Sequence, residues 1–222
     1  LFLGKISLTK YGINLTQILA LHQFQSPDFM PHQLITHFFM HANFTHLLFN
    51  MFALWMFGKI LENIWGGKRF LAYYMFTGLG AAALHLGVSQ YEILNLQSQL
   101  NPSDLNILLE NGKSILEKGQ NYANHTMGKL NLLINTPTVG ASGAVFGILL
   151  AFGILFPNTL LYIYFAIPVK AKYFVIAYGV LELYLGFSNN PADNVAHFAH
   201  LGGMLFGFLL LKYWQKGKNT FY

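Results

Sequence analysis

Apolar segments long enough to cross a lipid bilayer dominate this chain, and short clusters of cations separate them. Hydrophobic residues make up 54% of the sequence and charged residues only 9%, whereas about a quarter of a soluble domain is charged. A spanning helix needs roughly 20 mostly apolar residues, and several segments approach that length. The composition therefore predicts an integral membrane protein and excludes a soluble globular domain.

The apolar segments predict an all-α, polytopic bundle, because only helices satisfy every backbone polar group within one segment of a bilayer. The expected spans are 44–60, 70–88, 142–157, 173–187 and 196–214, and the third can extend through the aromatic stretch 160–167. Residues 1–3 are interpreted as the stub of a first core helix that is missing or truncated. We expect an outer loop region (1–43), two spanning helices (44–88), an outer insert (89–137), three spanning helices (138–214) and a cytoplasmic tail (215–222).

The distribution of cations predicts how the bundle is oriented in the membrane. If the 44–60 span starts outside, the inner loops and tail hold eight cations and one acid, Glu62, whereas the outer segments hold five cations and six acids. Cytoplasmic loops carry an excess of Lys and Arg. Residue 142 is therefore expected at the outer face of a cell membrane.

The formal charge of +5 at pH 7 is a poor indicator of nucleic-acid binding here, because the cations lie in loops between spans. We expect the lipid bilayer as a partner and no nucleic acid. The chain has no cysteine, which excludes disulfides, thiolate metal sites and a cysteine nucleophile.

The insert at 89–137 interrupts the membrane pattern. Residues 101–104 (Asn-Pro-Ser-Asp) combine a helix cap, a proline in the first turn and an acid near the positive helix end. An apolar stripe follows at helical spacing: Leu105, Leu108, Leu109, Gly112, Ile115 and Leu116. We expect an outer amphipathic helix whose stripe packs on the protein or the bilayer, with a partner contact as the alternative.

Residues 138–157 run from a small-residue turn directly into an apolar helix. Gly143, Gly147 and Ala151 lie four apart, which favours close packing against another membrane helix. Ser142 lies at the helix start, where free backbone N–H groups can stabilise an oxyanion. This stretch alone is compatible with packing or with a nucleophile.

Histidines supply candidate partners for Ser142. His200 opens the last span, and Gly203 and Gly207 give that helix its own close-approach face. If the two glycine faces pack together, Ser142 and His200 meet, and a histidine beside a serine can activate the hydroxyl as a general base. His46 and Asn50 share a helix face and suit either an oxyanion or interhelical hydrogen bonds.

Three separate segments resemble the rhomboid intramembrane serine proteases. Residues 36–41 and 46–50 look like the second core helix of that family. The segment 140–143 is similar to its Gly-x-Ser-Gly motif, and 199–207 resembles its Ala-His-x-x-Gly-x-x-x-Gly helix. Their order and spacing agree over most of 31–214.

The resemblance implies a serine endopeptidase that uses a dyad, with Ser142 as nucleophile and His200 as base. It assigns the oxyanion hole to the Ser142 backbone N–H, His46 and Asn50. Its supporting residues are Gly140, Gly143, Phe146, Gly203 and Gly207, with Phe146 packing on the His200 ring. The segment 188–195 corresponds to a movable cap. The implied substrates are single-pass transmembrane proteins, and no cofactor is implied.

Other polar residues are given weaker roles. His197 lies one turn before His200 and is the alternative base, although only His200 has the motif distance to Gly203. His37 and His41 have a spacing that can bind metal, but no Glu adjoins them, so hydrogen bonding is favoured and no metal is expected. Glu182 is expected to face the wet interior or to pair with a polar neighbour, without a catalytic role, and no Asp or Glu is expected to complete a triad.

The sequence is also compatible with two other functions. The chain can be an inactive relative that binds membrane proteins without cleaving them, although it retains Ser142, His200, His46 and Asn50 together. It can also be a metal-dependent membrane enzyme or transporter built on the histidines, although carboxylates do not adjoin them in the sequence.

The orientation is testable by single-cysteine labelling, since the chain has no cysteine of its own. Ser114→Cys should react with an impermeant maleimide in intact cells, while Gly67→Cys should not, because the charge asymmetry places the two positions on opposite sides. The reverse labelling pattern would place Ser142 at the inner face.

Overall fold

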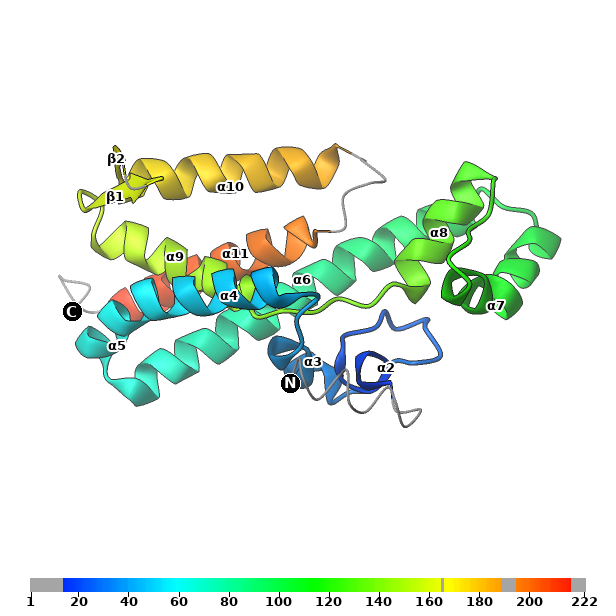
Figure 1. The fold of residues 1–222 in the computed structure, drawn as a ribbon, viewed down its shortest axis with the longest axis horizontal. Coiled ribbons are helices and arrows are strands. Elements are labelled where there is room, and N and C mark those ends of the chain that lie inside the picture. Colours follow the sequence, from blue (N-terminus) through cyan, green and yellow to red (C-terminus); the bar gives the residue numbers. More distant parts are fainter. Residues whose placement is uncertain (1–13, 165, 189–194, 217–222) are drawn as a thin grey trace. The chain divides into compact units, whose positions relative to one another are not determined.

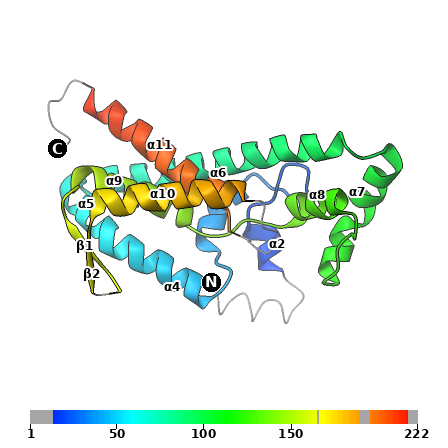
Figure 2. The same ribbon diagram turned by 90° about the horizontal axis from the view of Figure 1, so that it is seen from above.

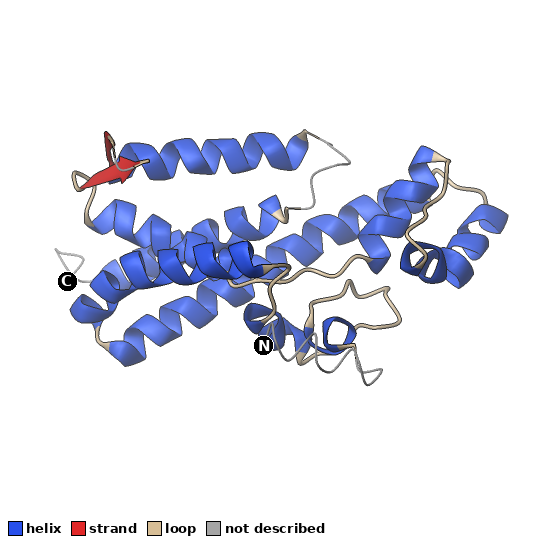
Figure 3. Cartoon of the chain, viewed as in Figure 1, coloured by secondary structure: helices blue, strands red, loops and turns tan. Residues whose placement is uncertain are grey.

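The computed structural model describes residues 14–164, 166–188 and 195–216 (Figure 1). The described chain is mostly helical, as expected (Figure 3). Its elements are α2 (Leu15–Leu19), α3 (Gln33–Thr36), η1 (His37–Phe39), α4 (Phe44–Ala53), η2 (Leu54–Gly58), α5 (Lys59–Trp65), α6 (Gly67–Gln97), α7 (Pro102–Glu117), α8 (His125–Asn135), α9 (Ser142–Leu155), β1 (Leu160–Ile163), β2 (Ile167–Lys170), α10 (Ala171–Phe187) and α11 (His197–Gln215). The expected stub at 1–3 and most of the expected cap at 188–195 lie outside the described residues.

The chain forms two compact units. The first consists of Leu1–Met40 and Leu86–Val139, and the second of His41–His85 and Gly140–Tyr222. Helix α6 contributes its first part to the second unit and its last part to the first unit.

Within the part of the chain that the structure describes, two helical runs are long and apolar enough to cross a membrane, Phe44–Trp65 and Gly67–Gln97. The first run passes from α4 through a π-helical turn, η2, into α5. Gly66 ends it with a φ of 75°, a conformation that costs glycine little, and α6 starts at the next residue. Helix α9 is a shorter apolar helix.

Helix α6 extends nine residues beyond the expected end at residue 88. No glycine or proline occurs between residues 89 and 97, so nothing in the sequence ends the helix there. The first part of the expected insert is therefore a continuation of the second predicted span.

The expected extension of the 142–157 span through residue 167 is wrong. Helix α9 ends at Leu155, and β1 and β2 form an antiparallel pair in which Leu160 lies opposite Lys170 (Figure 2). Pro157 follows the helix and has no N–H to continue it. This small hairpin beside the start of α10 is the one sheet within the described residues of an otherwise helical fold.

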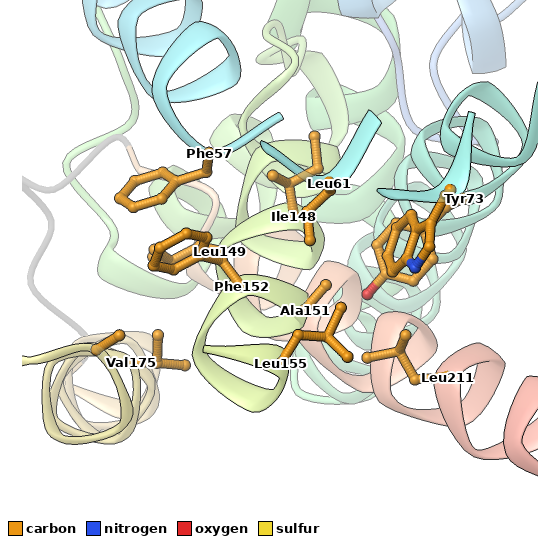
Figure 4. Packing of buried hydrophobic residues seen from close by; sticks show 12 residues of the cluster. Phe57, Leu61, Tyr73, Ile148, Leu149, Ala151, Phe152, Leu155, Val175 and Leu211 are labelled. Carbon is orange, nitrogen blue, oxygen red and sulfur yellow. The ribbon is translucent and has the colours of Figure 1, made fainter. Parts of the chain in front are cut away.

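The hydrophobic core of the second unit surrounds α9. Apart from Ser142, Leu150 and Ile154, every residue of this helix is buried, so it carries no amphipathic stripe. Figure 4 shows the packing of α9 residues with side chains from η2, α5, α6, α10 and α11. The labelled members are Phe57, Leu61, Tyr73, Ile148, Leu149, Ala151, Phe152, Leu155, Val175 and Leu211.

Helix α7 lies where an amphipathic helix is expected in the insert. The Asn101 side chain caps it by accepting from the Asp104 N–H at 2.9 Å, and Pro102 is in its first turn. Leu108 and Gly112 are buried in the first unit, where Leu108 packs with residues of α6 and α8. The stripe therefore packs on the protein. Helix α8 was not expected from the sequence.

Gln33 holds the N-terminal loops of the first unit together and is fully buried. Its Nε2 donates to the Asp28 carbonyl at 2.8 Å, and its Oε1 accepts from the Met30 N–H at 3.1 Å. A salt bridge of 2.6 Å joins Asp28 to Lys113 on α7. Although burial opposes ionisation, the hydrogen bond from Lys113 holds the pKa of Asp28 below its usual value.

His37 is buried in the same unit, and its Nδ1–H donates to the Gln33 carbonyl at 2.7 Å. Burial lowers the pKa of His37 from 6.5 to about 4. Between these values the unfolded chain binds a proton and the folded chain does not. Folding stability should therefore fall as the pH drops from about 6.5 to about 4.

We predict that burial of the neutral His37 side chain lowers the free energy of unfolding by about 2 kcal/mol as the pH falls from 7 to 5. His37→Gln should reduce that loss, measured by unfolding in detergent at both pH values. His125→Gln is the matched control, because His125 is exposed at the start of α8. An unchanged pH dependence in His37→Gln would contradict the assignment.

Candidate functional site

Ser142 starts α9, and the turn before it lies against α4. Gly140 has a φ of 119°, which other residues rarely adopt. A Cβ at Gly140 would lie 2.8 Å from Cε1 of the His46 ring, which is too close. Glycine at this position therefore lets the turn before the serine pass directly beside His46.

The starts of α9 and α11 meet through a backbone contact. A Cβ at Gly203 would collide with the carbonyl group of Gly143, and one at Gly143 would collide with the side chain of Ala81 on α6. Such close approach is possible only with small residues in the interface. It brings the residues one turn or less away, Ser142 and His200, beside each other.

The glycines further along both helices face α6 instead of each other. A Cβ at Gly147 would collide with Thr77, and one at Gly207 with the Tyr73 hydroxyl. The Tyr73 hydroxyl donates to the Gly147 carbonyl at 3.0 Å. The expected pairing of the two glycine faces thus holds at Gly143 and Gly203, whereas Gly147 and Gly207 pack against α6.

Ser142 and His200 are in direct contact. The Ser142 Oγ lies 2.8 Å from Nε2 of His200. The Phe146 ring stacks on the His200 ring with centroids 4.1 Å apart and an interplanar angle of 6°, so the expected contact between them is present. Tyr178 of α10 in turn packs on Phe146, with centroids 5.0 Å apart.

Glu182 completes a cluster that the sequence reasoning missed. Its Oε2 lies 2.8 Å from Nδ1 of His200 and 2.6 Å from Nδ1 of His197. The expectation that no Asp or Glu is positioned to make a triad is therefore wrong. The signal was an acid in the middle of an apolar span, together with histidines three residues apart on one helix face.

The acid and both histidines of the cluster are buried, and Ser142 is half-buried. The side chains of Glu182 and His200 belong to residues that are only 4% and 8% exposed. A buried carboxylate is costly unless donors satisfy it, and two imidazole N–H groups do so here. With Nδ1 of His200 donating to Glu182, Nε2 is left to accept the Ser142 hydroxyl hydrogen.

The expected oxyanion residues lie on α4, with His46 one turn before Asn50. The Asn43 side chain caps this helix by accepting from the His46 N–H at 2.8 Å. Asn50 is buried, and its Nδ2 donates to the His46 carbonyl at 2.9 Å. His46 thus contacts the Ser142 turn, and Asn50 is fixed to the backbone of His46.

Glu182, His197 and His200 also form a group whose ligand atoms lie within 4.8 Å of one another, a spacing compatible with a metal ion. Ligands of one tetrahedral zinc ion would lie roughly 3.3 Å apart, given bonds of about 2.0–2.1 Å. The carboxylate oxygen instead lies at hydrogen-bonding distance from both nitrogens. This geometry favours a hydrogen-bonded cluster.

The close contact at Gly203 generates a prediction about stability. Gly203→Ala should destabilise the protein by about 1–3 kcal/mol, because the added methyl group forces α11 away from the Gly143 carbonyl. Thermal unfolding in detergent measures the effect. Gly87→Ala on α6 is the matched control, since its Cβ would meet nothing within 4 Å. Equal midpoints for the two variants would contradict the contact.

Comparison with known proteins gives a consistent family match. The model of the Rhomboid domain matches residues 28–216. The chain is 29% identical to RHOMBOID-like protein 12, mitochondrial, of Arabidopsis thaliana, over 86% of this chain and 48% of that protein. It is 28% identical to the putative rhomboid protease YdcA of Bacillus subtilis, over 80% of this chain and 64% of that protein.

A third relative is the rhomboid protease AarA of Providencia stuartii, 30% identical over 77% of this chain and 51% of that protein. The chain spans about half the length of the curated relatives it matches first. No solved structure gives a significant match.

Proposed function

The chain belongs to the rhomboid family, and we propose that it is an intramembrane serine endopeptidase that cleaves transmembrane segments of other membrane proteins. Members of this family are membrane proteins, and several relatives carry the name protease. The observation that supports the proposal best is the distance of 2.8 Å between the Ser142 hydroxyl and Nε2 of His200.

In the proposed reaction, Ser142 is the nucleophile and His200 the general base. The Ser142 Oγ forms a bond to the carbonyl carbon of the scissile peptide as its proton passes to Nε2 of His200. The tetrahedral intermediate then breaks its C–N bond, and His200 returns the proton to the leaving amine. Water, activated by the same histidine, hydrolyses the acyl-enzyme and regenerates Ser142.

The oxyanion that forms on the carbonyl oxygen needs fixed donors. The proposed donors are the Ser142 backbone N–H at the start of α9, the His46 ring and the Asn50 amide. An amide nitrogen carries two hydrogens, and the one that does not bond the His46 carbonyl is the one assigned to this role. Loss of one such donor typically costs about 10²–10³ in rate.

The stacked ring of Phe146 supports the base, because it limits rotation of the His200 imidazole away from Ser142. Gly140, Gly143, Gly203 and Gly207 are proposed to support the site through the close contacts of their backbones. No cofactor takes part in this mechanism.

The proposed location is a cell membrane, with Ser142 near its outer face. The charge distribution between the apolar segments supports this orientation, and bacterial proteins are among the relatives. The proposed partners are therefore the lipid bilayer and single-pass transmembrane substrates.

The test of this function is the response of the purified protein to a fluorophosphonate probe and to a transmembrane substrate. Ser142→Ala should abolish probe labelling and lower cleavage by at least about 10³-fold, since no other group replaces the nucleophile. Removal of one hydroxyl should change folding stability by no more than about 1 kcal/mol. Chelation by EDTA should leave the wild-type rate unchanged.

Two outcomes would contradict the proposal. Cleavage that survives in Ser142→Ala and stops with EDTA would indicate a metal-dependent enzyme. A folded wild-type protein that binds a transmembrane segment without cleavage or labelling would indicate an inactive relative.

A further inference from the structure

The proposed mechanism uses Ser142 and His200 but leaves a buried carboxylate beside the base without a role. Glu182 is the one acidic residue of α10, a helix of 17 residues, and it is buried five residues before the helix end at Phe187. Placing an ionisable group there is costly, and such residues in spanning helices usually serve a function. Its Oε2 accepts at once from Nδ1 of His200 and Nδ1 of His197.

We propose that Glu182 is a positioning residue for the base, so that the site works as a Ser142–His200–Glu182 triad. This inference rests on the proposed function. Glu182 does not reach the substrate in this role, and it acts only through the imidazole of His200.

Glu182 determines the tautomer of His200. A neutral imidazole carries its single proton on Nδ1 or on Nε2, and only the unprotonated nitrogen can accept the serine hydroxyl hydrogen. An ionised carboxylate 2.8 Å from Nδ1 is an acceptor, so it retains the proton on Nδ1. Nε2 is then unprotonated where it meets the Ser142 Oγ at 2.8 Å.

Glu182 also stabilises the imidazolium that forms when His200 takes the serine proton. The positive charge develops at a site only 8% exposed, so water does little to stabilise it. The Glu182 carboxylate lies within hydrogen-bonding distance of that charge and stabilises it directly. The carboxylate remains unprotonated throughout the reaction.

Glu182 also helps to fix the orientation of the His200 ring. His200 is held by Glu182 at Nδ1, by Ser142 at Nε2 and by the Phe146 ring on one face. Tyr178, one helical turn before Glu182 on α10, packs on Phe146. The same face of α10 therefore fixes the imidazole through a hydrogen bond and through an aromatic contact.

His197 acts on the carboxylate from the other side. Its Nδ1 donates to the same Oε2 atom at 2.6 Å, so Glu182 keeps a donor whatever the protonation of His200. His197 therefore supports the ionised form of Glu182 and takes no part in proton transfer. Loss of His197 leaves the bond between Glu182 and His200 intact.

The test compares Glu182→Gln with the wild-type full-length chain by two independent readouts. Gln has nearly the same shape, so the variant should fold, and its thermal unfolding should confirm this. The rate of fluorophosphonate labelling of Ser142 and kcat for substrate cleavage should fall by about 10²–10⁴-fold, with little change in KM. Glu62→Gln on α5 is the matched control and should keep the wild-type rate.

The second readout is the tautomer of His200, measured by nitrogen NMR on histidine-labelled protein, with His200→Ala to assign the signal. The wild type should show the proton on Nδ1, and Glu182→Gln should shift it towards Nε2, because the amide can donate to Nδ1. This readout does not depend on activity. It therefore tests the positioning role even if the wild type neither labels nor cleaves, an outcome that would refute only the protease proposal.

A double-mutant comparison separates positioning from a general structural effect. In the His200→Ala background, Glu182→Gln should cause no further loss of residual labelling, because its only route of action has been removed. His197→Gln should retain most of the wild-type rate.

Three results would overturn the inference. The first is a wild-type labelling rate in folded Glu182→Gln, and the second is an unchanged tautomer. The third is loss of labelling when EDTA is added to the wild type, which would assign the three residues to a metal ion.

Discussion

Every polar group of the candidate site must find its partner inside an apolar bundle, and this constraint governs the rest of the structure. In hydrocarbon there is no water to replace a missing hydrogen bond. The carboxylate of Glu182 is satisfied by two imidazoles, and one of these imidazoles is satisfied by Ser142. The three helices α9, α10 and α11 must therefore hold their registers to within a fraction of a turn.

Small residues make that register possible. Gly143 and Gly203 let the backbones of α9 and α11 touch, while α6 packs against Gly147 and Gly207 through Thr77 and Tyr73. A bundle without a hydrophobic driving force between its helices depends on such close packing and on interhelical hydrogen bonds. The polar cluster and the glycine contacts thus stabilise the same helix arrangement.

The helical character of the fold could be predicted from the sequence, because long apolar runs mark the positions of α4–α5, α6, α9, α10 and α11. The helix cap at Asn101 could also be predicted, because its hydrogen bond to the Asp104 N–H joins residues only three apart in the sequence. The hairpin of β1 and β2 could not be predicted, because short aromatic and apolar stretches fit either a strand or a helix end. Helix α8 was missed although Met127, Leu130 and Ile134 follow helical spacing and are buried in the core of the first unit.

The pairing of Ser142 with His200 was predicted from their distances to glycines on the two helices. Glu182 was different, because residues 182 and 200 belong to separate helices and no motif spacing links them. Only the relative rotation of α10 and α11, which packing determines, brings the carboxylate to the imidazole. The hydrogen bonds of Gln33 were also missed, because its partners are backbone groups of nearby loop residues and no sequence motif specifies that loop conformation.

The contact at Gly203 also limits how the sequence can evolve. At Gly80 an added methyl group would meet the side chain of Phe206, so a smaller residue at 206 could compensate for the change. At Gly203 the obstacle is the carbonyl group of Gly143, which every amino acid possesses. No second substitution at residue 143 can therefore suppress the effect of replacing Gly203. Gly80 and Gly203 thus differ in whether a second substitution can rescue their loss.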